Sequence, residues 1–449
     1  MKIFKIWSKF YLLFNISKSY LLLFIISIYN SNSQYISIPF RNERSLFSLP
    51  KNTNIEKIYE YLIETDIVIN LEIGTPSQII PTSLSLWNKY IYITSNEIDI
   101  GIYDKNKSSS FETNNEEAFS DLNYYKKGLY CSDIFHFNSN NNLKNEKLSF
   151  ILTKSMEYST EYRKGLIGLQ ITSYKQEETF INQLKRKNLI NNYYHFMHFK
   201  NEDEGDFVVG TLPHDYNHKK YSYNNFRQVN AREISQSWEL LITNIRYGET
   251  KFEDKIFDLN FKFGMISVSV MMKHQYYNDF FEKRIKKGLC EESLYKDYFI
   301  YSCINDEKKV KFKELKDFHF YNKGLENDFV FTYKDLFVTV NNRRYFLITY
   351  KLNSITNTLG KPFFKKYTIG FNPDNKQIVH YIQEETNKSS LHKNNIYFII
   401  VIILLSFILI SLGYIFFKFI RKKARKNIIE ENYEYIPEEK KLNVEMIKV

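Results

Sequence analysis

The chain has 449 residues, 43% of them hydrophobic and 17% aromatic, with only 14 glycines, which excludes a disordered protein and predicts a large folded core. The formal net charge of +11 is concentrated at the two ends, in the lysines of the first 18 residues and in a basic cluster at 418–426. The long middle part is therefore close to balanced. This excludes the basic face of a nucleic-acid-binding protein, and we expect no nucleic-acid partner.

Residues 1–34 have the layout of a signal peptide. A basic start is followed by the short apolar run "YLLLFIISIY" and then by the small polar residues "NSNSQ". The apolar run is too short to span a bilayer comfortably, which favours a signal peptide over the alternative of an uncleaved amphipathic anchor. Residues 35–59 then form either the mature N-terminal segment or a short pro-region.

A second apolar run, residues 396–417, contains 22 residues without a charge and is long enough for one transmembrane helix. The basic cluster that follows it predicts that the tail, residues 418–449, lies in the cytoplasm. Residues 35–395, including a linker at 386–395, then face the secretory lumen or the outside. The sequence thus predicts a single-pass type I membrane protein of the secretory pathway, in an endolysosomal compartment or at the cell surface.

Three cysteines are present, Cys131, Cys290 and Cys303. In an oxidising compartment the close pair Cys290 and Cys303 is the natural disulfide, which leaves Cys131 as a buried, inert thiol rather than a reactive one. The nine histidines are scattered without metal-ligand spacing. We therefore expect no metal and no cofactor.

The segment between the two apolar runs reads mainly as β-strands. Helical patterns are few and short, at 177–188 and 273–287. The predicted strands are short β-branched or aromatic runs bounded by Asn, Gly, Asp or Pro. They are "DIVINLEI", "KYIYI", "DIFHF", "KLSFIL", "DFVVGTL", "WELLITNIRY", "FVFTY", "RRYFLITY" and "QIVHYI".

A weak internal duplication divides these strands into two halves. The first half has "LSLWNKYIYI" and later the Gly-containing apolar run "GLIGLQ", and the second has "FDLNFKFGMISV" and later "LGKPFF". Two related β-rich lobes are the simplest explanation.

In chain order these motifs resemble those of the pepsin-like aspartic proteases, over roughly residues 60–382. The matching stretches are "LEIGTPSQ", "SSSFE", "KGLIGLQ" with the helix-like "FINQLKRKNLI", "GDFVVGTL", "WELLITNIRYGE", the Cys290/Cys303 pair and "LGKPFFKKYTIGFNPDNKQIVHY". The resemblance implies a mainly β, bilobal double-barrel fold with lobes at 60–225 and 226–385, followed by the single transmembrane helix.

Proteases of this family need two aspartates, one on a tight Asp-Thr/Ser-Gly loop of each lobe, that share a proton and hold a water between them. Aligned without gaps from Gln78, the first such loop falls on Ser85, Leu86 and Trp87. Serine cannot act as the general base of this pair. A tryptophan at the glycine position is expected to block the close approach of the two lobes.

The second loop aligns through "MISVS" and falls on Asn260, Phe261 and Lys262. Asparagine has the shape of aspartate but stays neutral, so it cannot share a proton. A two-residue shift would bring in Asp258 instead, but no small residue and glycine follow it. The first lobe would still lack its carboxylate.

The flap hairpin of the family corresponds to "LNYYKKGLYCSD", where Tyr124 or Tyr125 stands for the flap tyrosine without a following glycine. We expect the binding cleft to be lined by one of these tyrosines together with Trp87, Phe261 and Lys262.

The sequence therefore predicts a catalytically inactive relative of the pepsin-like proteases that binds a peptide or protein through its cleft. Two alternatives remain open at this stage. One is an active membrane-anchored aspartic endopeptidase with a divergent pair of catalytic groups. The other is a non-enzymatic surface or adhesion protein whose cleft is filled by its own side chains.

Overall fold

The structure is a computed structural model that describes residues 34–42, 49–50, 53–64, 66–95, 102–118, 125–139, 142–156, 165–171, 178–232, 237–352, 356–382, 413–414 and 416–422. The predicted signal peptide lies outside the described residues apart from Gln34, and the linker at 386–395 lies outside them entirely. Only the last residues of the predicted transmembrane run are described. Among the described residues, no helix is long and apolar enough to cross a membrane.

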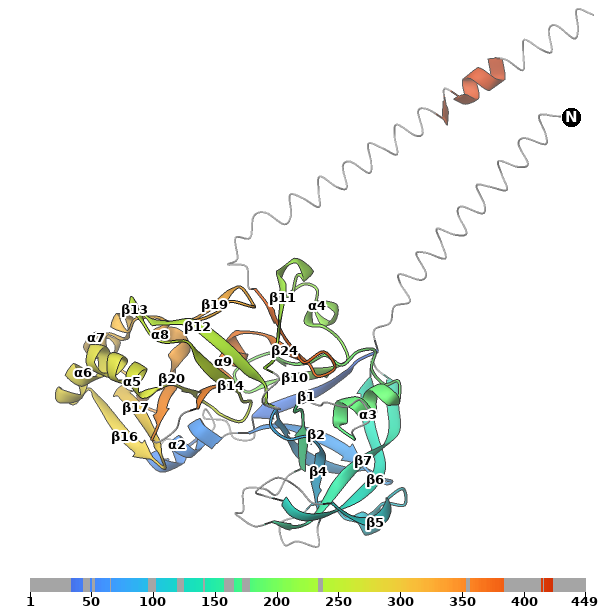
Figure 1. Cartoon of the computed structure of the whole chain (residues 1–449), viewed down its shortest axis with the longest axis horizontal. Coiled ribbons are helices and arrows are strands. Elements are labelled where there is room, and N and C mark those ends of the chain that lie inside the picture. Colours follow the sequence, from blue (N-terminus) through green and yellow to red (C-terminus); the bar gives the residue numbers. More distant parts are fainter. Residues whose placement is uncertain are drawn as a thin grey trace, which may run out of the picture. The chain divides into compact units, whose positions relative to one another are not determined.

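The chain forms two compact units, Met1–Ile382 and Gln383–Val449. The first unit is mainly β (Figure 1). One of its sheets runs, in order of neighbouring strands, through β11 (Phe226–Asn230), β25 (Gln377–Tyr381), β24 (Ile369–Asn372), β9 (His195–Phe199), β10 (Glu204–Val209), β1 (Ile36–Asn42), β2 (Ile67–Ile73), β3 (Gln78–Ser85), β8 (Gly165–Gly168), β4 (Ile91–Thr94), β7 (Asn142–Met156), β6 (Tyr125–Ser139) and β5 (Glu112–Ala118).

The other sheet of this unit is built from the second half of the chain. Its order is β19 (Asn327–Phe331), β18 (Phe318–Asn322), β12 (Glu239–Tyr247), β14 (Lys255–Leu259), β23 (Asn357–Leu359), β15 (Ile266–Ser267), β22 (Ile348–Lys351), β17 (Tyr298–Ile304), β21 (Arg343–Phe346) and β20 (Phe337–Val340), with β13 (Thr250–Lys251) on β12 and β16 (Cys290–Tyr295) on β17. The mainly β architecture with two sheets is consistent with the predicted bilobal fold. All the predicted strands listed above overlap strands of the structure.

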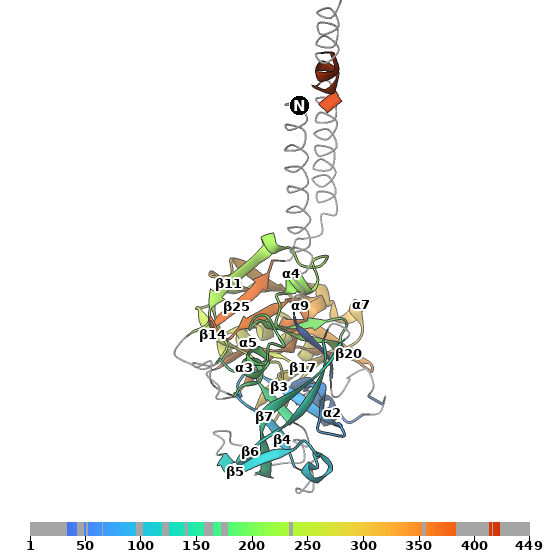
Figure 2. The ribbon, with the colours of Figure 1, turned by 90° about the vertical axis from the view of Figure 1, so that its right-hand side faces the viewer.

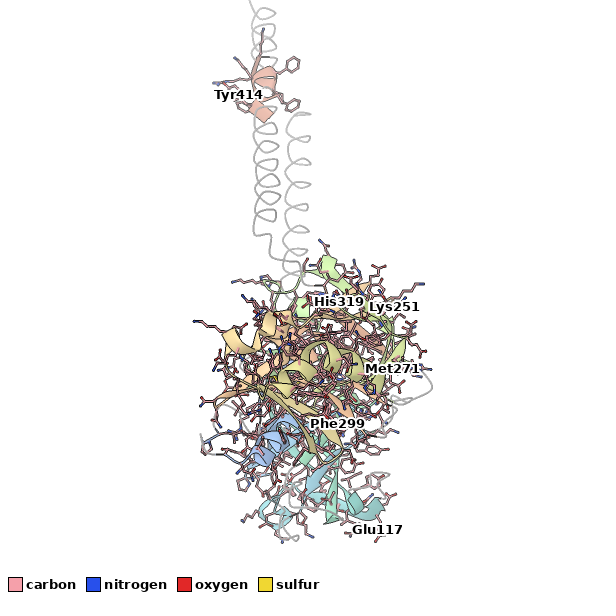
Figure 3. The ribbon with its side chains drawn as sticks, turned by 90° about the vertical axis from the view of Figure 1, so that its left-hand side faces the viewer. Glu117, Lys251, Met271, Phe299, His319 and Tyr414 are labelled. Atoms are coloured by element: carbon pink, nitrogen blue, oxygen red, sulfur yellow. A yellow bond between two sulfur atoms is a disulfide. The ribbon has the colours of Figure 1, made fainter. Side chains whose placement is uncertain are left out.

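The first sheet joins the beginning, middle and end of the unit. The run from β11 to β1, which we call the central run, places β24 and β25 from the end of the unit beside β9 and β10 from its middle. Figure 2 shows β5, β6 and β7 at one end of the first unit and β11 and β25 toward the other. In Figure 3, Glu117 on β5 marks the same outer end. In the central run, this sheet joins strands from the first half of the chain to strands from the second half.

Strand β2 illustrates why these sequences fold as strands. In "IVINLEI" only Asn70 and Glu72 are exposed, and the apolar residues around them are buried. Alternation of this kind places every second side chain on the same face of the sheet, and a shift of one residue would expose the whole apolar set. The buried set continues into a core that is rich in Phe, Tyr and Ile.

The helices of the first unit are short. They are α2 (Ile55–Glu64), η2 (Lys105–Lys107), α3 (Phe180–Arg186), α4 (Pro213–Tyr216), η3 (Tyr223–Asn225), α5 (Val270–Tyr276), η4 (Tyr277–Phe281), α6 (Glu282–Lys286), α7 (Glu307–Val310), η5 (Phe312–Glu314), α8 (Tyr333–Leu336) and α9 (Lys361–Lys366). The prediction of helix at 177–188 is confirmed by α3, which begins after the N-cap Thr179. The helix predicted at 273–287 is found as α5, the π-helical turn η4 and α6.

The predicted disulfide between Cys290 and Cys303 is present. The two residues lie directly opposite each other on β16 and β17, so the bond staples the hairpin at the edge of the second sheet. Cys131 is a free thiol on β6 and is buried, as predicted.

Candidate functional site

In the first lobe, a loop that follows Ser85 connects β3 to β4, and both strands pair with β8. Strand β3 runs parallel to β8, with Ser85 opposite Gly168, and β4 returns antiparallel to β8. The loop passes so close to Gly168 that a Cβ atom there would lie 2.4 Å from the carbonyl oxygen of Asn88 and 2.5 Å from the carbonyl carbon of Lys89. Only glycine fits at this position without moving the backbone.

The second lobe repeats this arrangement. Strand β14 runs parallel to β23, and β15 returns antiparallel to β23. The loop between them begins at Asn260, whose N–H donates to the carbonyl of Leu359 at 3.2 Å. A Cβ atom at Gly360 would lie 2.1 Å from the carbonyl oxygen of Met265 and 2.2 Å from that of Phe263. Each lobe thus folds one loop over one glycine.

Ser85 and Asn260 have the same local role in these two loops. The Ser85 Oγ accepts a hydrogen bond from the N–H of Trp87 at 3.3 Å, and the Asn260 Oδ1 accepts one from the N–H of Lys262 at 2.9 Å. In both cases the donor lies two residues further along the chain, so each side chain closes a turn of the same type. Asp258 lies earlier, inside β14 and opposite Thr358. The last paired residues are Leu259 and Leu359, so the next position on each strand brings Asn260 to Gly360, as Ser85 lies opposite Gly168. Asn260, and not Asp258, is therefore the counterpart of Ser85.

Asp258 has a carboxylate neighbour within its own lobe. It lies directly across from Glu239 on β12. Burial raises the pKa of the Asp258 carboxyl, and the charge of Glu239 raises it further. Arg232 approaches Glu239 at 3.9 Å. Because both carboxylates belong to the second lobe, they do not form the arrangement of one acid from each lobe that aspartic proteolysis requires.

Apolar residues follow Ser85 and Asn260, at the positions where the protease chemistry needs small or hydroxyl-bearing residues. Leu86 and Phe261 are each only 1% exposed. The Phe261 ring packs against Phe364, with ring centroids 4.7 Å apart, and against Phe371. Phe261 was expected to line the cleft, but the structure buries it in the core, because its neighbours on α9 and β24 are aromatic. A hydroxyl brace between the loops is absent at these two positions.

The other residues predicted to line the cleft are placed differently from one another. Trp87 is 47% exposed, so its ring is available to a partner at the tip of the first loop. Lys262 is half-buried and its Nζ lies 3.8 Å from Asp66, which also accepts a hydrogen bond from Ser83 at 3.0 Å. Asp66 thereby links the strand that carries Ser85 to the loop of the second lobe.

The predicted flap, residues 122–133, falls mostly on β6, which follows β5 in the chain. These two strands pair antiparallel, with Ala118 opposite Gly128. Tyr124 lies outside the described residues. Tyr125 is the first residue of β6, opposite Met156 on β7. Two paired strands therefore lie where the resemblance predicts the flap, and residues 119–124, which connect them in sequence, lie outside the described residues.

Sequence reasoning missed helix α2, which covers the loop of the second lobe. A Cβ atom at Gly264 would lie 1.9 Å from the carbonyl oxygen of Leu62, and the Gly264 N–H donates to the carbonyl of Ile63. Figure 3 shows α2, in blue, beneath the labelled Phe299 of β17. The buried residues of this contact come from α2 and from the second lobe. They are Ile58, Tyr59, Leu62, Ile63, Phe263, Met265, Ile300, Val340 and Tyr345.

The signal for α2 was present in the sequence. Apolar residues recur at Ile55, Ile58, Tyr59, Leu62 and Ile63, which is the spacing of one helical face. Before it, Asn54 accepts a hydrogen bond from the N–H of Glu56. That an N-terminal helix would pack onto the second lobe could not be read from this pattern.

One further contact joins the two lobes near these loops. The indole N–H of Trp238, at the start of the second lobe, donates to the carbonyl of Leu169 at 2.7 Å, directly after Gly168. The Trp238 ring also packs on Phe371 of the central run, with centroids 4.8 Å apart. The relative position of the two glycine-backed loops is thus fixed by buried aromatic packing.

A β protein with two sheets and one glycine-backed loop in each has the architecture that the resemblance to pepsin-like proteases predicts. A sequence model of the eukaryotic aspartyl protease family matches residues 67–380, which is well over half of the chain. The chain therefore belongs to the eukaryotic aspartyl protease family. The comparison with curated proteins gave no match.

Proposed function

We propose that this protein is a catalytically inactive member of the pepsin-like aspartyl protease family. The observation that carries the proposal is the equivalence of Ser85 and Asn260, which rests on strand pairing and on the turn that each side chain closes. A hydroxyl and a carboxamide stand where the reaction requires two carboxylates that share one proton. Leu86 and Phe261, both buried, occupy the positions where hydroxyl groups would brace such a pair.

We further propose that the protein is anchored as a single-pass type I membrane protein, with residues 35–395 in the secretory lumen or outside the cell. The uncharged run at 396–417 and the basic residues after it support this proposal. The described helix at its end exposes the aromatic residues Tyr414, Phe416 and Phe417 next to Lys418. Aromatic and basic side chains of this kind are enriched where a helix leaves the bilayer.

We also propose that the inactive protease fold binds a peptide or protein. Trp87 supports this proposal, because a half-exposed tryptophan at the tip of a fixed loop offers a large, rigid contact surface. We propose that the ligand contacts the first loop, because Trp87 is exposed there, whereas α2 packs against Gly264 in the second lobe.

A second candidate function is favoured by α2 itself. The close contact of Leu62 and Ile63 with Gly264, together with the burial of Phe261, fits a protein whose cleft is filled by its own chain. Such a protein would act as a surface or adhesion protein through another face. The active endopeptidase is the weaker alternative, since Asp258 and Glu239 lie in one lobe.

These candidates are separated by one experiment on the purified protein. It is incubated with a random peptide library at pH 7 and at pH 4, and bound and free peptides are identified by mass spectrometry. We expect bound peptides to be recovered intact, and the Trp87→Ala variant to retain at most a tenth of them. Recovery of no peptide at either pH would contradict the binding proposal and favour the surface protein. Cleaved peptides would contradict the proposal of inactivity.

A further inference from the structure

A cavity of about 540 Å³ lies between the end of β1, helix α2, strand β20 and helices α8 and α9. Its lining includes Asn42 and Leu62 from the start of the chain, Gly264 from the second loop, and Lys361 from α9. The volume falls within the range of small-molecule sites, which is roughly 300–1,000 Å³. The cavity contains neither Ser85 nor Asn260, so the proposed loss of catalysis does not explain it.

One wall of this cavity is apolar. It is made by Leu62 of α2, Phe337 and Val338 of β20, Leu347, and Pro362 of α9. Leu62 and Pro362 are buried, and the other three are half-buried. A wall of this kind gains free energy when it covers an apolar group, because water is removed from both surfaces.

The lining also carries lysines. Lys361, Lys365 and Lys366 belong to α9, and Lys334 belongs to α8. Lysines in a partly closed space attract an anion more strongly than lysines on an open surface, because water screens their charge less. A lining that combines apolar side chains with lysines suits a molecule with an apolar body and one anionic group.

Lys361 is the most buried of these lysines, with 6% of its surface exposed. Its Nζ donates to the Asn42 Oδ1 at 3.0 Å, and the Asn42 amide in turn donates to Asp203 at 2.8 Å. Burial lowers the pKa of the Lys361 amine to about 7, and the charge of Lys365 lowers it further, while Asp66 and Asp203 act in the opposite direction. A bound anion would favour the charged form of this amine.

Three carboxylates also line the cavity, and they restrict the ligand. Glu202 forms an ion pair with Lys365, and Asp335 forms one with Lys366 at 2.6 Å. The same Asp335 oxygen also accepts hydrogen bonds from Thr332. A ligand with several negative charges would approach these carboxylates and Asp203 closely. The cavity therefore suits a single carboxylate and disfavours polyphosphates.

We propose that this cavity binds the carboxylate of a small apolar molecule, with Lys361 as the partner of the carboxylate and the wall of Leu62, Phe337 and Val338 as the partner of the apolar group. A peptide C-terminus with an apolar last residue and a free organic acid share this chemistry. The inference does not rest on the peptide-binding function proposed above, because it concerns residues other than Trp87.

The test uses the full-length protein in detergent micelles and equilibrium dialysis. The probes are N-acetyl-alanyl-leucine, its C-terminal amide, and 4-methylpentanoate. We expect the free peptide acid to bind at least tenfold more tightly than the amide. Because binding requires the charged Lys361 amine, affinity should be at least tenfold higher at pH 6 than at pH 9. Binding of 4-methylpentanoate with equal affinity identifies a free acid as the ligand, and weaker binding identifies a peptide C-terminus.

Two variants of Lys361 separate its charge from its structural role. Lys361→Met should lose at least tenfold in affinity for the acid at pH 6. Lys361→Arg should keep binding and lose the pH dependence, because arginine stays charged. If Lys361→Met does not fold, the cavity-filling variant Val338→Trp keeps the amine and should abolish binding. Equal binding of acid and amide, or unchanged binding in Val338→Trp, would overturn the proposal.

Discussion

The loops that follow Ser85 and Asn260 share one frame and differ in their surroundings. Each is held by a parallel and an antiparallel strand, passes over one glycine, and is closed by a hydrogen bond from a backbone N–H to the side chain two residues earlier. The first loop presents Trp87 to solvent, whereas the second is covered by α2. The comparison indicates that backbone packing gives both loops the same course, while the side chains that the two loops present to their surroundings differ.

The glycines behind the loops give the largest expected effect. Gly168→Ala and Gly360→Ala each place a methyl group within 2.4 Å of backbone atoms that cannot move independently. We expect each variant to lose about 3 kcal/mol or more of unfolding free energy, measured by denaturant titration. Gly288→Ala is the control. It has open space around it and a φ of +70°, and should lose about 1 kcal/mol. Tolerance of alanine at only one of the two loop glycines would break the equivalence of the loops.

The central run that joins the lobes is expected to weaken in acid. Burial lowers the pKa of His195 to about 3 and that of His380 to about 4. The unfolded chain, with histidine pKa values near 6.5, binds more protons between these limits. Stability is therefore full above about pH 6.5 and falls as the pH is lowered. We expect a loss of about 2 kcal/mol per histidine between pH 8 and pH 5.

His195 provides a variant that checks the cause of this loss. Its ring stacks on Phe371 and approaches Phe207, so His195→Phe should fit the same space. Denaturant titrations at pH 8 and pH 5 should show a smaller loss in His195→Phe, and an unchanged loss in His218→Gln, whose side chain is exposed. A parent protein that is equally stable at both pH values would contradict this account. Proteolysis at acidic pH would require the central run to stay folded at pH values where its buried histidines lower the stability.

The packing of helix α2 on the second loop is tested by a substitution of Gly264. Gly264→Ala places a methyl group 1.9 Å from the Leu62 carbonyl oxygen and should displace α2 from the second lobe. We expect a loss of about 2 kcal/mol in unfolding free energy and faster limited proteolysis between residues 53 and 66. Gly288→Ala should leave the cleavage rate of this segment unchanged. Protection of α2 in Gly264→Ala equal to that in the parent protein would mean that α2 is not held by this contact.

The smallest effect is expected at Ser85 and Asn260, whose side chains close the two turns. Asn260→Ala removes the acceptor of the turn hydrogen bond from the Lys262 N–H, whereas Ser85→Ala removes the acceptor of two hydrogen bonds, from the Trp87 N–H and from the Asn88 side-chain amide. Each should cost about 1 kcal/mol of unfolding free energy, with the larger value for Ser85→Ala. A cost in one lobe alone would show that the two turns are not equivalent.

Much of the fold could be predicted from the sequence. The alternating runs identified strands such as β2, the spacing of Cys290 and Cys303 gave the disulfide, and "GLIGLQ" and "LGKPFF" marked the two glycines behind the loops. These features depend on local sequence. The ungapped alignment placed Ser85 at the end of β3 because the turn at Gly74 and the strand after it fix the register.

The surroundings of the site could not be predicted. Phe261 was expected at the cleft and is buried, because its aromatic neighbours Phe364 and Phe371 come from segments about a hundred residues away. The packing of α2 onto Gly264 and the burial of Lys361 beside Asn42 depend on similar long-range contacts. Periodicity and motif spacing contain no information on which distant segment will cover a given residue.

The central claim is that no pair of carboxylates, one from each loop, is available for aspartic proteolysis. The most direct measurement is peptide cleavage by the purified protein between pH 3 and pH 8, followed by mass spectrometry, in the parent protein and in Asp258→Asn and Asp66→Asn variants. The account predicts no cleavage above the background of a heat-denatured sample at any pH. Cleavage in the parent protein that is abolished in either variant would contradict it.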